Sequence, residues 1–172
     1  MKINKLLFFI FLYTSIIYTK SYSAENKSGT FEGKGGAEDH SFLNVTNSNL
    51  KKGKDFFKQA IKLKKKNKIK KSGIKFEKAL GYFVLAHKEY PENVEILNYL
   101  GFTYNVIGDL IMSEIYYQQA LVLDPKNPTI NQGLGELYLE TKRINLAKER
   151  LEALSICNCQ EYIKLKNLLE KN

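Results

Sequence analysis

Cys157 and Cys159 are the two residues of this chain whose types and spacing come nearest to a chemical site. Two thiols separated by one residue could form a local disulfide, exchange electrons, or bind a soft metal ion as a thiolate pair. A metal ion would need further ligands, and the two histidines, His40 and His87, lie far away in the sequence. The spacing therefore favours a structural disulfide that shapes the turn before a last helix, with redox or metal chemistry as the alternative.

No other group of residues points to catalysis. His87 lies in the segment 86–89, where an exposed helical position is the ordinary outcome. The chain after residue 23 has no nucleophile elbow, zinc-ligand spacing or carboxylate pair. Its glycine-rich run, residues 33–36, is not followed by the helix that phosphate binding would require. We therefore expect no enzyme activity, no cofactor and no metal site.

Positive charge is concentrated in one segment, residues 51–75. The whole chain has 27 basic and 18 acidic residues, a net charge of +9. Twelve lysines and one acid, Asp55, fall within residues 51–75, so the rest of the chain after residue 23 is slightly acidic. The predicted basic surface consists of Lys51, Lys52, Lys54, Lys58, Lys62, Lys64, Lys65, Lys66, Lys68, Lys70 and Lys71.

Three interpretations of this basic segment remain open. It is a solvated helix face in a lysine-rich protein, or it docks onto an anionic surface such as a membrane leaflet or an envelope polymer. Nucleic acid is the least favoured ligand, because the segment contains no arginine and because the chain is expected to be exported.

The first residues predict export. Lys2 and Lys5 precede an apolar run, residues 6–18, and small residues follow at the positions that signal peptidase requires before Ala24. The run is too short to span a bilayer. We therefore expect a cleaved signal peptide at residues 1–23, a flexible linker rich in glycine and serine at residues 24–47, and one domain at residues 48–172 in the periplasm.

A regular period runs through the second half of the chain. Residues of the same type recur at one fixed distance, including the small residues that let two helices approach closely. This period, of about 34 residues, and its pattern resemble the tetratricopeptide repeat (TPR), a unit of two antiparallel helices called A and B. The matched positions are Leu100 and Leu134, Gly101 and Gly135, Tyr104 and Tyr138, Pro91 and Pro125, and the series Phe83, Tyr117 and Leu151.

The resemblance implies an all-α solenoid of about three hairpins and a C-terminal cap. The repeats are expected at about residues 48–93, 94–127 and 128–158, with a capping helix at 160–171. The first A helix is irregular in this register, because Asn67 stands one period before Gly101. We expect that helix at residues 49–66 and its turn at 67–71. The third repeat is degenerate, with Asn131 where a large apolar residue is usual.

TPR solenoids usually bind through the concave surface lined by their A helices. The repeat register predicts a polar groove with a few apolar anchors, which suits an extended or helical peptide held by side-chain amides. The predicted groove residues are Glu95, Asn98, Phe102, Asn105, Gln132, Glu136 and Leu139, with Val106, Thr129 and Glu140 beside them.

Three segments, residues 98–102, 134–138 and 157–162, are similar to those of small exported bacterial TPR proteins, a family that is largely uncharacterised. The resemblance implies a periplasmic interaction protein. The sequence thus predicts a non-catalytic scaffold that binds an unidentified envelope protein or peptide in its groove. The alternative is binding of an anionic membrane or polymer by residues 51–75. The oligomeric state is left open.

Overall fold

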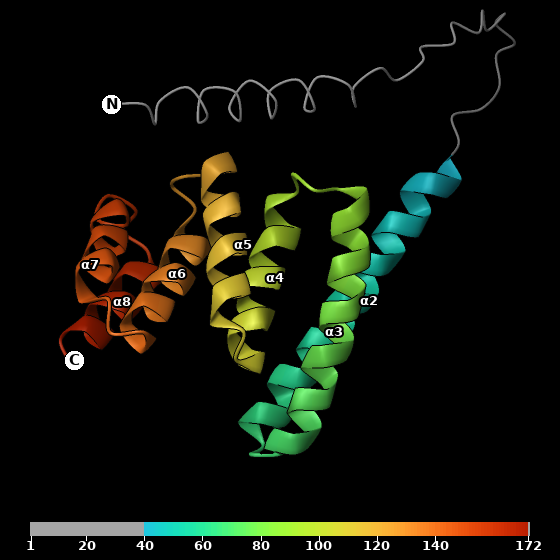
Figure 1. Ribbon diagram of the computed structural model, residues 1–172, viewed down its shortest axis with the longest axis horizontal. Coiled ribbons are helices and arrows are strands. Elements are labelled where there is room, and N and C mark those ends of the chain that lie inside the picture. Colours follow the sequence, from blue (N-terminus) through green and yellow to red (C-terminus); the bar gives the residue numbers. More distant parts are fainter. Residues whose placement is uncertain (1–39, 172) are drawn as a thin grey trace, which may run out of the picture. The chain divides into compact units, whose positions relative to one another are not determined.

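The computed structural model describes residues 40–171, with side chains from Ser48 onward, and every regular element in that part of the chain is a helix. These helices form three antiparallel hairpins and a final helix (Figure 1), which confirms the predicted all-α solenoid with a C-terminal cap. The hairpins are α2 (His40–Lys65) with α3 (Ile69–Glu89), α4 (Val94–Ile107) with α5 (Leu110–Leu123), and α6 (Pro128–Glu140) with α7 (Ile144–Ala153), followed by α8 (Gln160–Leu169).

The predicted boundaries differ from the structure mainly at the first hairpin. The expected signal peptide, residues 1–23, and residues 24–39 of the expected linker lie outside the described residues. Helix α2 begins at His40, so residues 40–47 of that linker are helical. The turn expected at 67–71 is shorter, because α3 already begins at Ile69. The expected cap, residues 160–171, contains α8.

Short polar side chains start several of the helices. Asn93 and Asn127 are one repeat period apart, and each side chain accepts a hydrogen bond from the backbone N–H three residues later, at 3.1 and 3.2 Å. Asp109 does the same for α5, at 3.1 Å from the N–H of Met112. These caps satisfy N–H groups that have no partner inside a helix. They fix where α4, α5 and α6 begin.

The turn inside each hairpin contains one residue in the left-handed backbone conformation. These residues are Asn67, Gly108 and Lys142, with φ of 56°, 93° and 58°. Glycine and asparagine tolerate this conformation best. Gly108 and Lys142 are one repeat period apart, whereas the distance from Asn67 to Gly108 exceeds that period by seven positions. The first hairpin therefore has a longer spacing than the repeat period.

A close contact between a glycine and an aromatic ring shows where the extra residues lie. A Cβ on Gly101 would be 2.7 Å from the Tyr117 ring, and a Cβ on Gly53 would be 2.6 Å from the Phe83 ring. The residues of the first pair are 16 apart in sequence and those of the second pair are 30 apart. The first hairpin thus has fourteen more positions beyond its glycine–aromatic contact than the second.

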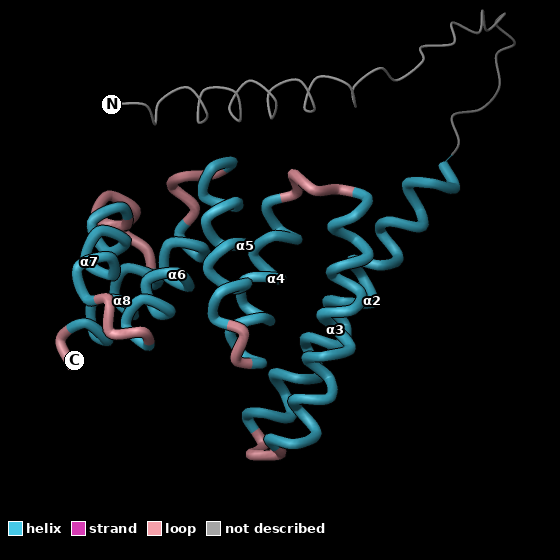
Figure 2. Tube along the Cα trace, in the orientation of Figure 1, coloured by secondary structure: helices cyan, strands magenta, loops and turns pink. Residues whose placement is uncertain are grey.

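The fourteen extra positions of the first hairpin are divided equally between its two helices. Ser113 Oγ donates to the carbonyl oxygen of Gly101 at 2.8 Å, and Ser72 Oγ donates to that of Ala60 at 2.9 Å. Ala60 lies seven residues after Gly53, so each helix is longer by seven residues, or about two turns and 10 Å. Figures 1 and 2 show the α2–α3 hairpin extending beyond the end of α5, with its turn at the far end.

Two clusters of buried side chains hold the hairpins together, and α4 contributes to both. Ile96 and Leu100 pack with Phe83 of the first hairpin, whereas Leu97 packs with Tyr117 and with the residues of α6, α7 and α8. The second cluster reaches the cap, where a Cβ on Gly135 would be 2.5 Å from Leu165. Helix α8 therefore covers the apolar end of the solenoid, as solenoids require.

The third repeat accommodates its unusual asparagine. Asn131 is fully buried. Its Nδ2 donates to the carbonyl oxygens of Pro125 and Asn127, both at 3.0 Å, and its Oδ1 accepts from Arg150 Nη1 at 3.4 Å. A buried amide with these partners has little unpaired polarity. Asn131 thus ties α6 to the preceding loop and to α7.

Candidate functional site: the A-helix face and the hairpin tip

Helices α2, α4 and α6 are the first helices of their hairpins, and the surface that they share is here called the A-helix face. Polar contacts join neighbouring helices across it. Lys54 Nζ of α2 lies 2.6 Å from Glu95 Oε1 of α4, and Asn105 Nδ2 of α4 donates to Glu140 Oε2 of α6 at 3.2 Å. The hydrogen bond to Glu95 raises the pKa of Lys54. The A-helix face is thus polar and internally braced.

The structure places the predicted groove residues in two groups. Glu95, Asn98, Phe102 and Asn105 follow one another along α4 at helical spacing, and Gln132 and Glu136 follow along α6. Glu95 is exposed, and the other five are half-buried: Asn98, Phe102, Asn105, Gln132 and Glu136.

Leu139 differs from the other predicted groove residues. Its side chain is only 8 % exposed and belongs to the apolar cluster of Tyr138, Ala147 and Leu165. It stabilises the fold of the third hairpin and offers almost no surface to a ligand. The prediction that Leu139 lines an open groove was therefore wrong, because the periodicity of one helix does not show which neighbours cover it.

Phe57 is a residue of the A-helix face that was not among the predicted groove residues. Its ring centroid lies 5.1 Å from those of both Tyr99 and Phe102, and 5.6 Å from that of Phe76. This edge-on packing joins the first hairpin to the second. Phe102 is therefore also a packing residue. The sequence signal for Phe57 was its place among apolar residues at helical spacing, with Ala60 and Ile61, in the expected first helix.

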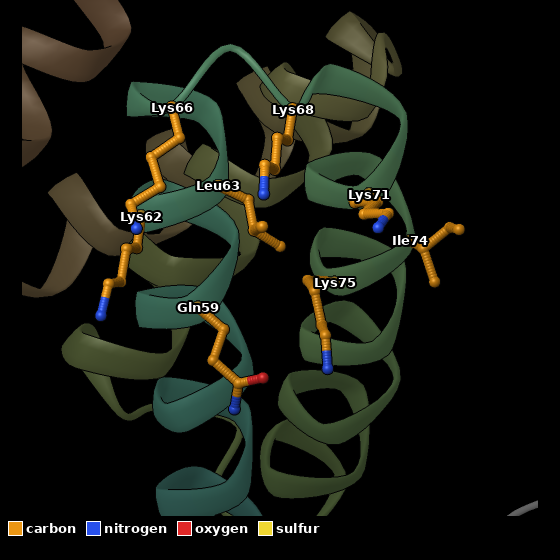
Figure 3. A pocket seen from close by; sticks show the side chains of 8 residues that line it. All are labelled: Gln59, Lys62, Leu63, Lys66, Lys68, Lys71, Ile74 and Lys75. Carbon is orange, nitrogen blue, oxygen red and sulfur yellow. The ribbon is translucent and has the colours of Figure 1, made fainter.

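The lysine-rich segment forms the end of the long first hairpin. We call residues 58–75 the hairpin tip; they contain nine lysines and no acid. Two hollows lie there, of about 540 and 550 Å³, and they share Lys62 and Lys66. Figure 3 shows side chains from both helices around the first hollow. Its lining is Gln59, Lys62, Leu63, Lys66, Lys68, Lys71, Ile74 and Lys75.

The predicted basic surface is continuous with this tip but not uniform along α2. Lys54 is paired with Glu95, and Lys52 lies 5.8 Å from the centroid of the Tyr82 ring. The ion pairs found in residues 48–171 include none of the nine tip lysines. Within residues 48–171, no ion pair therefore compensates their charge, and Lys75 Nζ lies 5.0 Å from the centroid of the Phe56 ring.

Cys157 and Cys159 are joined as a disulfide, with their Cα atoms 5.1 Å apart. Asn158 between them has a φ of 44°, and Cys159 precedes the first residue of α8. The bridge thus lies in the turn that leads into the cap. Residues 48–171 hold no group of three or more histidine, cysteine or acidic side chains placed to bind a metal ion.

His87 lies between hairpins rather than on an open helix face. Its ring packs edge-on against Tyr116 with the centroids 5.4 Å apart, and its buried Nδ1 atom has no hydrogen-bond partner. Burial lowers the pKa of His87, which favours the neutral imidazole. The expectation of an exposed position was wrong for this residue, because α5 packs on the same side of α3.

Comparison with protein families agrees with this architecture. Residues 116–171, from within α5 to the end of α8, match the model of the tetratricopeptide repeat. Residues 116–171 are thus similar to a tetratricopeptide repeat. A segment of 97 residues is 29% identical to the uncharacterized protein ycf37 of Guillardia theta. That segment covers 56% of this chain and spans about half, 53%, of the relative.

Solved TPR structures share the fold at low sequence identity. The TPR domain of Arabidopsis OM64 has a TM-score of 0.54 at 15% identity, over 72% of this chain and 98% of that one. The second TPR domain of human RPAP3, solved with an HSP70 peptide, has a TM-score of 0.55 at 16% identity, over 74% of this chain and 99% of that one. The Yersinia enterocolitica chaperone SycD, solved with a peptide of the translocator YopD, has a TM-score of 0.53 at 18% identity, over 69% of this chain and 89% of that one.

None of the helices within residues 40–171 is both long enough and apolar enough to cross a bilayer.

Proposed function

We propose that this protein is a non-catalytic scaffold of the bacterial periplasm that holds a peptide or partner protein against its A-helix face. The observation that carries the proposal is the row of half-exposed polar and aromatic side chains on α4, facing a second polar row on α6. Amide side chains along two neighbouring helices suit an extended backbone, which needs both donors and acceptors. Solved structures of the same fold with bound peptides support the same interpretation.

A partner would have to compete with contacts inside the protein. Glu95 is held by Lys54, Asn105 by Glu140, and Gln132 by Glu136 at 2.7 Å. Exposed pairs of this kind contribute little stability, so a ligand can exchange them at small cost. Asn98 lies between Glu95 and Phe102 on α4 and is the best position from which to probe the face.

Site-specific photocrosslinking tests this proposal. A photoreactive phenylalanine would replace Asn98 or Gln132, and a control chain would carry it at the exposed Gln119 of α5. We expect Asn98 and Gln132 to label the same envelope protein at both low and high salt, and Gln119 not to label it. Equal labelling from Gln119, or none from the A-helix face, would count against the groove.

The periplasmic location rests on the sequence of residues 1–23. Cell fractionation of the tagged chain, with and without these residues, tests it. We expect the full chain in the periplasmic fraction, shortened by about 23 residues as the cleavage pattern predicts. Cytoplasmic retention of the full chain would overturn this part of the proposal while leaving the groove untouched.

A further inference from the structure

The hairpin tip is an addition to the repeat rather than a part of it. Its seven extra residues per helix lie beyond the Gly53–Phe83 contact, which is the counterpart of Gly101–Tyr117. Within the extension the helices pack on each other through Ala60 and the Ser72 hydroxyl. The solenoid therefore does not need the extension to close its hairpin, and the tip is free to serve a separate purpose.

All charged side chains of the hairpin tip are positive. Nine lysines and no acid occur in residues 58–75, and none of the nine is among the ion pairs found in residues 48–171. Five of them line the first hollow, Lys58 and Lys65 line only the second, and Lys64 and Lys70 line neither. Such a distribution surrounds the end of the hairpin. It fits an extended anionic surface better than a single peptide seated on one face.

Apolar side chains lie among these lysines. Ile69, the first residue of α3, is 58 % exposed, and Ile74 is 48 % exposed at the rim of the first hollow. Leu63 lines that hollow from α2. Moving an exposed isoleucine at the end of a basic hairpin from water into an apolar layer lowers the free energy. A basic surface with apolar side chains is the combination that binds at the interface of an anionic bilayer.

We propose that the hairpin tip binds the surface of an anionic phospholipid bilayer, with its lysines at the phosphates and Ile69 at the boundary between headgroups and acyl chains. This inference goes beyond the scaffold function and does not depend on the A-helix face. The tip would attach one end of the solenoid to a membrane while α4 and α6 stay in water. The contact is electrostatic and interfacial, and no helix enters the bilayer.

Vesicle binding by matched charge variants is the first test. The tip variant carries Lys66→Gln, Lys68→Gln and Lys70→Gln, and the control carries Lys126→Gln, Lys148→Gln and Lys164→Gln at exposed positions in the second half of the chain. Both variants are full-length, so any lipid binding by other segments contributes equally to the two measurements. Binding is measured by co-sedimentation with vesicles of phosphatidylglycerol and phosphatidylethanolamine, and with phosphatidylcholine vesicles.

The expected result is a large difference between the two variants. A lysine near an anionic surface strengthens binding about fivefold, so the tip variant should bind phosphatidylglycerol vesicles about 100-fold more weakly. The control should bind like the unchanged chain, and added salt should remove the difference. Equal binding of the two variants would overturn the proposal.

A fluorescent reporter tests the depth of the contact. The chain has no tryptophan, so Ile69→Trp introduces a single one at the tip. The matched control is Val122→Trp, at a side chain that is 81 % exposed on α5. We expect anionic vesicles to shift the emission of Ile69→Trp to shorter wavelength, and brominated lipid to quench it, with neither effect for Val122→Trp. An unshifted tip emission, with binding only to a soluble acidic peptide such as polyglutamate, would overturn the bilayer as the ligand.

Discussion

The first and second hairpins solve the same packing problem with different lengths of chain. In the second, Gly101 and Tyr117 make the close contact, and Ser113 bonds to the Gly101 carbonyl. In the first, the two features are separated: Gly53 meets Phe83, and Ser72 bonds to Ala60, seven residues further along α2. Seven residues make nearly two full turns, so the same helix faces meet again. A hairpin can therefore gain two turns without changing how it packs on its neighbour.

The largest effect that tests this correspondence is expected from overpacking at the two glycines. Gly53→Leu and Gly101→Leu should each lower the free energy of unfolding by about 3 kcal/mol, because the new side chain would overlap an aromatic ring. Urea denaturation measures the effect. The controls are Gly73→Ala and Gly81→Ala, which have nothing within 4 Å of the new Cβ and should raise stability by about 0.5–1 kcal/mol. If Gly53→Leu behaved like these controls, the two hairpins would not correspond.

The next test removes the ring that joins the hairpins. Phe57→Ala should lower the free energy of unfolding by about 2 kcal/mol, less than for a fully buried phenylalanine, because the ring is half-buried. Phe56→Ala is the matched control, since Phe56 stacks on Tyr82 within the same hairpin, with centroids 5.6 Å apart. Its substitution should leave the docking of the first hairpin on α4 intact. Hydrogen exchange of α4 amides distinguishes the variants, and equal protection in both would contradict this assignment.

Hydroxyl removal gives a smaller and symmetrical effect. Ser72→Ala and Ser113→Ala each delete one buried hydrogen bond to a helix carbonyl, and we expect each to lower the free energy of unfolding by about 1 kcal/mol. Thermal unfolding checks the pair, with the exposed Ser155→Ala as the control. A large difference between the two variants would mean that the hydrogen bond in the extended hairpin does not contribute the same stability as its counterpart in the regular hairpin.

The smallest expected effect concerns pH at the junction of the hairpins. Burial lowers the pKa of His87 in the folded protein, while the unfolded residue keeps a value near 6.5. Below that value the unfolded chain takes up a proton that the folded chain resists, so stability falls as pH falls, until the lowered pKa is passed. His87→Gln should reduce the loss of stability between pH 7.5 and 5.5. An unchanged loss would show that the carboxylates alone cause it.

The repeat period was sufficient to predict the fold, the cap and the second and third hairpins. It failed at the first hairpin because a fixed offset of one period from Gly101 leads to Asn67, which lies in the turn with a positive φ. A second offset, longer by seven positions, would have related Ala60 to Gly101 and Ser72 to Ser113. That signal rests on small residues, which are common, and it becomes visible only when the contacts are known.

Side-chain environments were less predictable than helices. Glu95 is exposed and Leu139 is buried, although both were predicted to line the groove from the same helical register. His87, expected in solvent, faces Tyr116 of a later helix. In each case the outcome depends on contacts between helices, whereas the hydrophobic pattern reports one helix at a time.

Helix α4 contributes Ile96 and Leu100 to one apolar cluster and Leu97 to the other, and Tyr116 of α5 packs against both clusters. Within residues 48–171, α4 is therefore the main connection between the two ends of the solenoid. In a structure coupled between nearest neighbours, fraying from either end stops where both sets of contacts must break together. A force applied at the far end of the first hairpin would therefore reach the capping helix mainly through α4. The order of mechanical release should run from the ends inward, with α4 the last helix to lose its structure.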